Sequence, residues 1–471
     1  MSTPMMTLAQ AAQWLPTSQL VGDANIRPLR VHSDTRTIQP GDLFVALTGE
    51  KFDGNQFLKE AQAKGAVAAI CNSREALAAL GLGGLVVADT RAALASLAAA
   101  WRAQFSLPLI AVTGSNGKTT VTQMIASVLR SHAPGEMLAT EGNFNNDIGV
   151  PLTLLRLRAH HRFAVVELGM NHPGEIAVLA QLALPTIALV NNAQREHLEF
   201  MATVEAVARE NGAVFAALPG NGVAVFPQTD EFSKVWQKLA APRACLVFAD
   251  GTHTNDADVQ CDKGDWLGHA WQVEVKSLAG PLAFKLHIAG RHNVKNALAA
   301  IACTLAAGVA PATIAQGLEQ FEPVRGRSKS VRGLVGEHRF TLIDDTYNAN
   351  PDSVKAAVEV LAALPAPRLL VLGDMGEVGD RGPQFHAEAG AYAKASGIEA
   401  LYTLGELSAQ ASAGFGVGRH FSDVEHLKQE LLVVAKNYRS VLVKGSRFMR
   451  MERVVQALQE IAPEKVEAAC S

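Results

Sequence analysis

The chain has 471 residues, of which 48% are hydrophobic and 18% are charged. A chain of this length exceeds what one hydrophobic core usually serves, so we expect a globular α/β protein of three domains. The formal net charge of -3 provides no basic field of the kind that attracts nucleic acid or an anionic membrane. We therefore expect small-molecule partners, no nucleic acid and no membrane insertion.

The cellular compartment follows from features that the sequence lacks. It has no basic leader segment and no apolar run of the length that spans a bilayer. The cysteines are scattered and lack the spacing of a zinc site: Cys71, Cys245, Cys261, Cys303 and Cys470. We predict a cytoplasmic protein with reduced thiols and no zinc, and we expect a monomer.

The pattern of apolar runs divides the chain into three parts. Over residues 1–89, β-rich runs alternate with alanine-rich helical stretches and predict a small N-terminal α/β domain. Residues 90–322 predict a central domain around a mostly parallel sheet, which antiparallel strands between residues 245 and 290 extend at one edge. Residues 323–471 repeat the strand-helix alternation of a parallel sheet with right-handed crossovers, so we expect a Rossmann-like α/β domain.

A glycine-rich loop joins an apolar strand to an amphipathic helix early in the central domain. Gly114 and Gly117 allow backbone N–H groups to turn towards an anion at the positive end of the helix. Lys118 supplies a mobile cation, and the Thr119 hydroxyl can bind magnesium. The glycines are closer together than in the common P-loop, and an ordinary strand-to-helix turn is the alternative. We predict that the loop binds ATP and Mg²⁺ through Thr113, Gly114, Ser115, Asn116, Gly117, Lys118, Thr119 and Thr120.

Two more polar side chains follow apolar strands of the central domain. Glu167 ends a run typical of a buried strand, where a carboxylate is costly unless a metal, a cation or a hydrogen bond receives it. His197 follows the next strand, and the carboxyl ends of parallel strands meet at one edge of a sheet. We predict that Thr119, Glu167 and His197 bind the metal, and that Lys118, Glu167 and His197 are catalytic. A capping or solvated carboxylate and a structural histidine are the alternatives.

Two segments rich in amides predict substrate contacts. Residues 141–151 offer neutral donors and acceptors that suit a peptide or a sugar, although Asn and Gly also favour turns. Residues 344–352 carry carboxylates and amides at a strand end, and capping of the next helix needs only one of them. The candidate ligands are Asn143, Asn145, Asn146, Asp345, Tyr347, Asn348 and Asn350.

Basic residues near strand ends of the third domain are the last candidates. Arg327 lies near its start, and Lys444 and Arg447 end a later strand, with Ser446 between them. If the third domain moves, such cations can reach a transferring phosphate, whereas solvated surface charge is the alternative.

Taken together, these segments resemble the ATP-dependent Mur ligases of peptidoglycan synthesis, over nearly the whole chain. Residues 142–151, 167–171, 344–351 and 443–447 are most similar to the branch of that family that adds D-alanyl-D-alanine. The resemblance implies ATP-dependent joining of this dipeptide to the terminal carboxylate of UDP-N-acetylmuramoyl-tripeptide through an acyl phosphate. Another amino-acid-adding Mur ligase or a ligase like folylpolyglutamate synthase is an alternative. An ATP-dependent switch or binding protein is the alternative outside the ligases.

The resemblance also implies roles for individual residues. The N-terminal segments resemble the family's UDP-binding domain, which implies substrate contacts by Ser33, Arg36 and Thr48. Residues 291–296 resemble the segment that meets adenine. Further ATP contacts are implied for Asn296, Arg327 and Asp345.

One position departs from the family and generates a prediction. The family usually carries a lysine that becomes carbamylated and helps to hold a second magnesium ion, and that position falls on Asn211 here. Because asparagine cannot form a carbamate, we infer that a second metal is held by another arrangement, with Glu210 as a candidate, or is bound more weakly. We therefore expect activity, measured as phosphate release, to persist in buffer freed of carbon dioxide. Abolished activity would contradict this inference.

Overall fold

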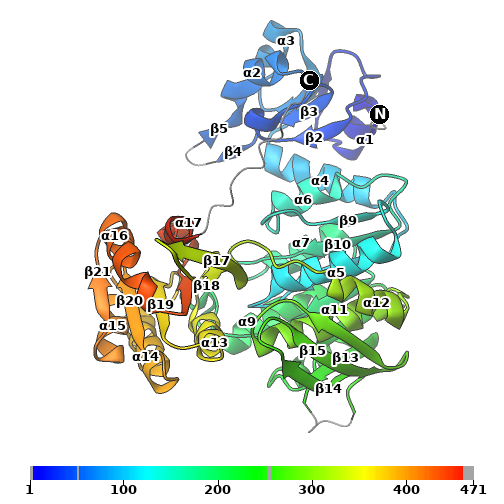
Figure 1. Ribbon diagram of the computed structural model, residues 1–471. Coiled ribbons are helices and arrows are strands. Elements are labelled where there is room, and N and C mark those ends of the chain that lie inside the picture. The colour runs from blue at the N-terminus through cyan, green and yellow to red at the C-terminus, as the bar shows by residue number, and fades with distance from the viewer. Residues whose placement is uncertain (1–3, 50–51, 252–255, 460–471) are drawn as a thin grey trace, which may run out of the picture.

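The computed structural model describes residues 4–49, 52–251 and 256–459. These residues form a five-stranded, a nine-stranded and a six-stranded sheet in that order along the chain, and a separate two-stranded sheet. Figure 1 shows the first sheet at the top, the second below it and the third at the lower left, each with helices around it. The predicted α/β class is thereby confirmed.

The first sheet has the strand order β1-β7-β6-β3-β2, in which β1 runs antiparallel to β7 and the other neighbours are parallel. The strands of this region are β1 (Gln19–Val21), β2 (Arg30–His32), β3 (Asp42–Val45), β4 (Thr48–Gly49), β5 (Phe52–Asp53), β6 (Ala68–Cys71) and β7 (Gly83–Val86). Its helices are α1 (Leu8–Trp14), α2 (Leu58–Ala63) and α3 (Arg74–Leu80).

The next helix connects the first sheet to the second. Helix α4 (Thr90–Arg102) begins where the Asp89 side chain accepts hydrogen bonds from two N–H groups of its first turn. It packs against α1 on one side and against α6 and α7 of the central region on the other (Figure 1). The predicted boundary at residue 90 lies at the start of this helix.

The central sheet has the order β16-β15-β14-β13-β12-β11-β8-β10-β9. Its strands are β8 (Leu109–Thr113), β9 (Met137–Ala139), β10 (Phe163–Glu167), β11 (Ile187–Val190), β12 (Val223–Pro227), β13 (Ala244–Asp250), β14 (Val259–Trp266), β15 (Trp271–Ser277) and β16 (Leu282–Leu286). The antiparallel extension predicted after residue 245 is present as β14, β15 and β16, although β13 itself pairs in parallel. The helices are α5 (Lys118–His132), α6 (Gly149–Leu154), α7 (Glu175–Ala183), α8 (Leu198–Met201), α9 (Val204–Gly212), α10 (Ser233–Ala240), α11 (Arg291–Ala306) and α12 (Pro311–Glu319).

Strand β8 is the centre of this sheet and places the phosphate loop. All five of its residues are buried, because helices cover both faces of the sheet. Ala111 contributes to the core on one face, whereas Ile110 and Val112 contribute to the core that includes α5 and α11 on the other. Since β8 lies between β10 and β11, the segments that follow these three strands meet at one edge.

The third sheet has the order β17-β18-β22-β19-β20-β21. Its strands are β17 (Lys329–Val335), β18 (His338–Asp345), β19 (Arg368–Gly373), β20 (Ala400–Leu404), β21 (Arg419–Phe421) and β22 (Ser440–Lys444), and its helices are α13 (Pro351–Ala362), α14 (Gly382–Ala395), α15 (Ala409–Phe415), α16 (Val424–Val434) and α17 (Glu452–Leu458). The predicted parallel pairing holds from β18 to β21, but the edge strand β17 forms an antiparallel hairpin with β18.

Membrane-spanning helices and paired cysteines can be checked in the described residues. None of the described helices is long and apolar enough to cross a membrane. Cys71, Cys245, Cys261 and Cys303 are free thiols, and Cys470 lies outside the described residues.

Candidate functional site

The predicted phosphate loop joins β8 to α5, and its backbone requires glycine. Gly114 has φ +126° and Gly117 has φ +81°, in the left-handed region that favours glycine. A Cβ atom on Gly117 would lie 2.6 Å from Asn296 Oδ1 and 2.8 Å from Asn191 Nδ2. The loop therefore packs directly against α11 and against the segment after β11, and a larger residue would push them apart.

Amide side chains from the segment after β11 hold the backbone of the loop. Asn192 Oδ1 accepts from the Asn116 N–H at 2.9 Å, and Asn191 Nδ2 donates to the Asn116 carbonyl at 2.8 Å. Gln194 Oε1 accepts from the Asn116 amide at 2.6 Å, and the Gln194 N–H donates to Ser115 Oγ at 2.9 Å. Asn191 and Asn192 are not among the residues predicted from the sequence.

Asn211, on α9, supports the base of the same loop. Its Oδ1 accepts hydrogen bonds from Thr113 Oγ1 at 2.6 Å and from the Gly114 N–H at 3.0 Å. Its Nδ2 donates to the Val207 carbonyl at 3.0 Å, and the residue is 1% exposed. Thr113 and Gly114, at the start of the loop, line neither of the two cavities described below.

Glu210, the candidate ligand for a second metal ion, caps the beginning of α7. Its carboxylate accepts from the N–H groups of Gly174 at 2.8 Å and Ile176 at 2.9 Å, at the beginning of α7. A carboxylate is favourable at the positive end of a helix. Glu210 is absent from the described lining of both cavities, so the structure gives no support to that assignment.

Lys118, the first residue of α5, is held by three oxygen atoms. Its Nζ donates to the carbonyl groups of Gly114 at 2.6 Å and Ser115 at 3.0 Å, and it lies 3.0 Å from Glu196 Oε1. The side chains of this ion pair are only 14% and 8% exposed. Sequence reasoning missed Glu196, for which the one available signal was its place beside His197.

His197 lies between two carboxylates. Its Nε2 is 3.3 Å from Glu196 Oε1, and its Nδ1 is 2.5 Å from Oε2 of Glu377, which follows β19. Burial opposes the charged imidazole, but the attraction of the two carboxylates outweighs burial and raises the pKa of His197 to about 9. Burial also opposes the charge of Glu196, yet Lys118 and His197 hold its pKa below the ordinary value. Charges thus alternate from Lys118 to Glu377.

Glu167 ends β10 with one carboxylate oxygen unused. Its Oε1 accepts from Asn145 Nδ2 at 2.7 Å, whereas Oε2 is buried and has no hydrogen-bond partner. Thr119 Oγ1 and Glu196 Oε2 are also buried without partners. Such oxygens are costly to bury, and oxygen ligands suit Mg²⁺, so these residues fit the predicted ion. Both ring nitrogens of His197 face carboxylates, so its role as a metal ligand stays a prediction.

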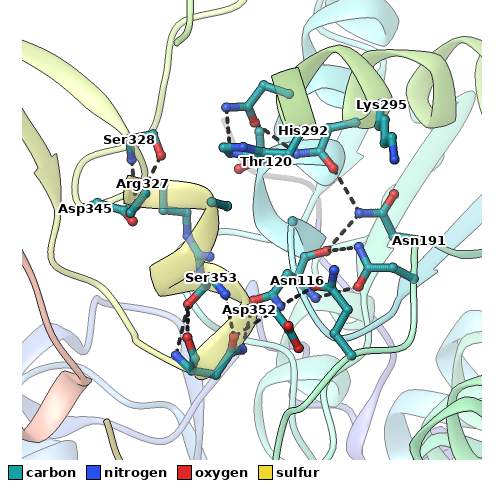
Figure 2. A pocket seen from close by; sticks show the side chains of 18 of the residues that line it. Asn116, Thr120, Asn191, His292, Lys295, Arg327, Ser328, Asp345, Asp352 and Ser353 are labelled. Atoms are coloured by element: carbon teal, nitrogen blue, oxygen red, sulfur yellow. Dashed lines mark hydrogen bonds between the residues drawn. The ribbon is translucent and has the colours of Figure 1, made fainter. Parts of the chain in front are cut away.

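A cavity of about 360 Å³ lies between the central and third sheets. Figure 2 shows Asn191, His292 and Lys295 on one side of it, and Arg327 and Asp345 on the other. Among the predicted residues it gathers Asn116, Gly117, Thr120, Asn296, Arg327, Asp345, Tyr347, Asn348, Asn350 and Lys444. Its wall also includes His292 and Lys295, from the segment that the resemblance placed near adenine. The sequence assigned no role to its other polar wall residues, among them Asn192, Asp230 and Asp250.

The third sheet presents a fixed arrangement of charge to this cavity. Asp345 and Lys444 end neighbouring strands in register, and their side chains form an ion pair of 2.6 Å. The other oxygen of Asp345 accepts from the Ser328 N–H at 2.9 Å. The Arg327 guanidinium lies 3.9 Å from the centre of the Tyr347 ring, a cation–π contact that holds the cation between the two cavities.

A second cavity, of about 1130 Å³, opens on the other side of the phosphate loop. Among the predicted residues it gathers Ser115, Asn116, Gly117, Lys118, Thr119, Asn143, Asn145, Asn146, Glu167, His197, Arg327, Tyr347, Asn348, Ser446 and Arg447. Its lining also includes residues without an assigned role, among them His172, Glu175, Glu196, Glu377 and Phe448. The phosphate loop therefore forms part of the wall of both cavities.

The residues predicted to bind UDP lie elsewhere. Ser33 follows β2 and Thr48 begins β4, so both belong to the first sheet region and line neither cavity. Arg36 is exposed and pairs with Asp34 at 2.6 Å, and this hydrogen bond lowers the pKa of Asp34 to about 2.

Polar contacts join the central region to the third one beside the cavities. The Arg195 N–H and guanidinium bind the Asp352 carboxylate at 2.8 and 2.7 Å, and Asn350 Nδ2 donates to Asn116 Oδ1 at 2.9 Å. The Asn350 side chain also accepts from the Ser353 N–H at 2.8 Å and so caps α13. Asn350 therefore serves both as a helix cap and as a contact with the phosphate loop.

A glycine-rich loop that joins a strand to a helix and lines two cavities is the arrangement of a nucleotide-binding protein of the α/β class. The chain matches family models described as Mur ligase family, catalytic domain, over residues 30–102; Mur ligase middle domain, over 112–304; and Mur ligase, glutamate ligase domain, over 326–447. The chain belongs to the Mur ligase family, as its sequence led us to expect.

Particular relatives cover nearly the whole chain. The Escherichia coli (strain K12) UDP-N-acetylmuramoyl-tripeptide--D-alanyl-D-alanine ligase is 40% identical over 97% of this chain and 98% of its own length. A crystal structure of MurF from Acinetobacter baumannii is 33% identical, with a TM-score of 0.86 over 96% of this chain and 99% of that one. The MurF ligase of Thermotoga maritima in complex with ADP is 25% identical, with a TM-score of 0.77 over 91% and 96% of the two chains.

The contacts of Asn211 generate a prediction. In the Asn211→Ala protein the Thr113 hydroxyl and the Gly114 N–H lose their buried acceptor, which should lower the free energy of unfolding by about 1–3 kcal/mol. We also expect weaker ADP binding, since both groups fix the phosphate loop. Urea denaturation and calorimetric titration with ADP measure the two effects. The exposed Asn437→Ala substitution is the control, and unchanged ADP affinity in Asn211→Ala would contradict the prediction.

Proposed function

We propose that this chain is an ATP-dependent ligase that joins D-alanyl-D-alanine to the terminal carboxylate of UDP-N-acetylmuramoyl-tripeptide. The product is the UDP-muramoyl-pentapeptide of peptidoglycan synthesis. One observation carries the proposal: a single phosphate loop separates a cavity of nucleotide size from a larger one that reaches the amide-rich loop. The names of the E. coli and A. baumannii relatives support it.

In this proposal ATP occupies the first cavity. The MurF ligase of T. maritima forms a complex with ADP, which supports a nucleotide site in this chain. The phosphates of ATP lie on the loop at the N-terminus of α5, a helix of 15 residues whose positive end favours anions. The amides of Asn116 and Asn296 and the cations Lys295, Arg327 and Lys444 supply donors around the nucleotide.

We place Mg²⁺ beside Thr119 and Glu167, whose unpartnered oxygens fit it. When bound there, the ion would neutralise charge on the transferring phosphate.

The first step of the proposed reaction forms an acyl phosphate. The terminal carboxylate of the tripeptide attacks the γ-phosphate of ATP, and ADP leaves. Because catalysis of phosphoryl transfer depends on placement and charge, Lys118 exchanges its present partners for phosphate oxygens. Arg327, held against Tyr347, supplies a second cation next to the loop.

In the second step the amine of D-alanyl-D-alanine attacks the acyl carbon, a tetrahedral intermediate forms, and phosphate leaves. The acyl phosphate must be kept from water until the amine arrives. The third region provides a wall of the second cavity through Asn348, Ser446 and Arg447, so closure of this region over the site would serve that purpose.

We assign the UDP-sugar to residues 1–89, ATP to residues 90–322 and closure to residues 323–471. Ser33, Arg36 and Thr48 then bind the UDP end, while the peptide end extends to the second cavity. The separation of the first sheet from the phosphate loop in Figure 1 supports this assignment, because the UDP-linked peptide is a long molecule. We further propose a cytoplasmic, monomeric enzyme.

A substrate panel tests the proposed function against its alternatives. Phosphate release from ATP is measured with a series of UDP-muramoyl peptides, each combined with a series of amino acids and dipeptides. We expect release that requires both UDP-N-acetylmuramoyl-tripeptide and D-alanyl-D-alanine. Preference for a single amino acid would indicate another ligase of the family, and release that needs neither substrate would indicate an ATP-dependent switch.

The role of Lys118 gives a quantitative prediction. Lys118→Ala removes the cation that we place on the transferring phosphate, and loss of such a contact raises the barrier by about 3 kcal/mol or more. This corresponds to a fall in kcat of roughly a hundredfold or more, measured by steady-state phosphate release. Near-normal turnover of the Lys118→Ala protein would refute the assignment.

A further inference from the structure

The carboxylate of Glu196 has one oxygen that takes part in none of the contacts described above. Glu196 is 7% exposed, and its Oε1 meets both of its charged neighbours, Lys118 Nζ at 3.0 Å and His197 Nε2 at 3.3 Å. Its Oε2 is buried without a hydrogen-bond partner. An anionic oxygen in this condition is costly, and a cation is one of the few partners that can stabilise it.

Two further oxygens share this condition and the same cavity. Thr119 Oγ1 and Glu167 Oε2 are buried and unpartnered, and both residues line the second cavity together with Glu196. Hydroxyl and carboxylate oxygens are the ligands that Mg²⁺ and Mn²⁺ prefer. The three residues come from α5, from β10 and from the segment after β11. Each of these three elements therefore brings one oxygen without a hydrogen-bond partner to the same cavity.

The ion pair of Glu196 with Lys118 lasts only while no phosphate competes for Lys118. When Lys118 turns to ATP, it leaves the carbonyl groups of Gly114 and Ser115 and also leaves Glu196. The remaining partner, His197, is shared with Glu377. The buried carboxylate of Glu196 then keeps only this shared cation as a balancing charge, and a divalent cation can replace the charge of Lys118.

We propose that Glu196 is a ligand of a divalent metal ion in the nucleotide-bound protein, and that Lys118 takes the place of this ion when no nucleotide is bound. The inference rests on the proposed ATP site and adds Glu196 to the predicted ligands Thr119 and Glu167. Among the described residues no three His, Cys, Asp or Glu side chains form a ready-made metal cluster. The ion therefore depends on the departure of Lys118, and oxygens of a bound nucleotide would add to its ligands.

Binding of Mn²⁺ tests this proposal without reference to catalysis. The full chain is titrated with Mn²⁺ at saturating ADP, and free Mn²⁺ is measured by electron paramagnetic resonance. Glu196→Gln keeps the shape of the side chain and removes its charge, so we expect Mn²⁺ affinity to fall about tenfold or more, or one bound ion to be lost. The control is Glu199→Gln, the same change on an exposed side chain, which should bind Mn²⁺ as the wild type does. Wild-type Mn²⁺ binding by Glu196→Gln overturns the proposal.

A second variant tests the exchange between Lys118 and the ion. Without nucleotide, Lys118→Ala frees Glu196, so this protein should bind Mn²⁺ more tightly than the wild type. The gain should disappear in the double variant Lys118→Ala/Glu196→Gln. No gain in Lys118→Ala overturns the proposal, whether or not the Glu196 variants fold. An equal gain in the double variant also overturns it, because the gain would then not depend on the Glu196 carboxylate.

The Mn²⁺ titration and the substrate panel test two different proposals, and either proposal can be refuted without the other. Mn²⁺ and ADP are the probes here, and no peptide is involved. Loss of Mn²⁺ in Glu196→Gln together with a different peptide preference would refute the proposed substrates and support the metal ligand. Ligation of D-alanyl-D-alanine together with unchanged Mn²⁺ binding in Glu196→Gln would support the proposed substrates and refute Glu196 as a metal ligand.

Discussion

The whole site depends on the position of β8 between β10 and β11 in the central sheet. Burial on both faces fixes this strand, so the loop that follows it has one possible location. The same geometry brings Glu167 from β10 and the amides after β11 to that loop. Gly117 then allows α11 to approach until Asn296 touches the loop. A parallel sheet thus gathers at one edge residues that are far apart in the sequence.

Charge is distributed around the phosphate loop in an ordered way. From Lys118 through Glu196 and His197 to Glu377, positive and negative groups alternate across the boundary between two sheets. His197 at φ +50° and Glu377 at φ +58° both have left-handed backbones, which are unfavourable for residues other than glycine. Neighbouring charges compensate the burial of each group, and a phosphate anion at the loop would compete for the cation at one end of the series.

The boundary between the central and third regions is polar where the cavities lie. Arg195 binds Asp352 there, and Asn116 of the phosphate loop bonds to Asn350 at the beginning of α13. Polar contacts of this kind exchange readily with water, so they can join two regions without locking them together. The position of α13 is thereby coupled to the backbone of the loop that holds the phosphates.

The sequence by itself determined the α/β class, the phosphate loop, the strand-end carboxylate Glu167 and the family, because hydrophobic periodicity and glycine-rich motifs are local in the chain. It also marked the amide-rich segments as ligand candidates. Only the tertiary structure showed that Asn350 contacts Asn116, that Asn211 supports the loop and that Glu210 caps α7. It alone revealed Glu196 as the partner of Lys118. These pairings join residues 36 to 234 positions apart, and only the packing of strands and helices decides which distant side chains meet and which buried oxygens remain without a partner.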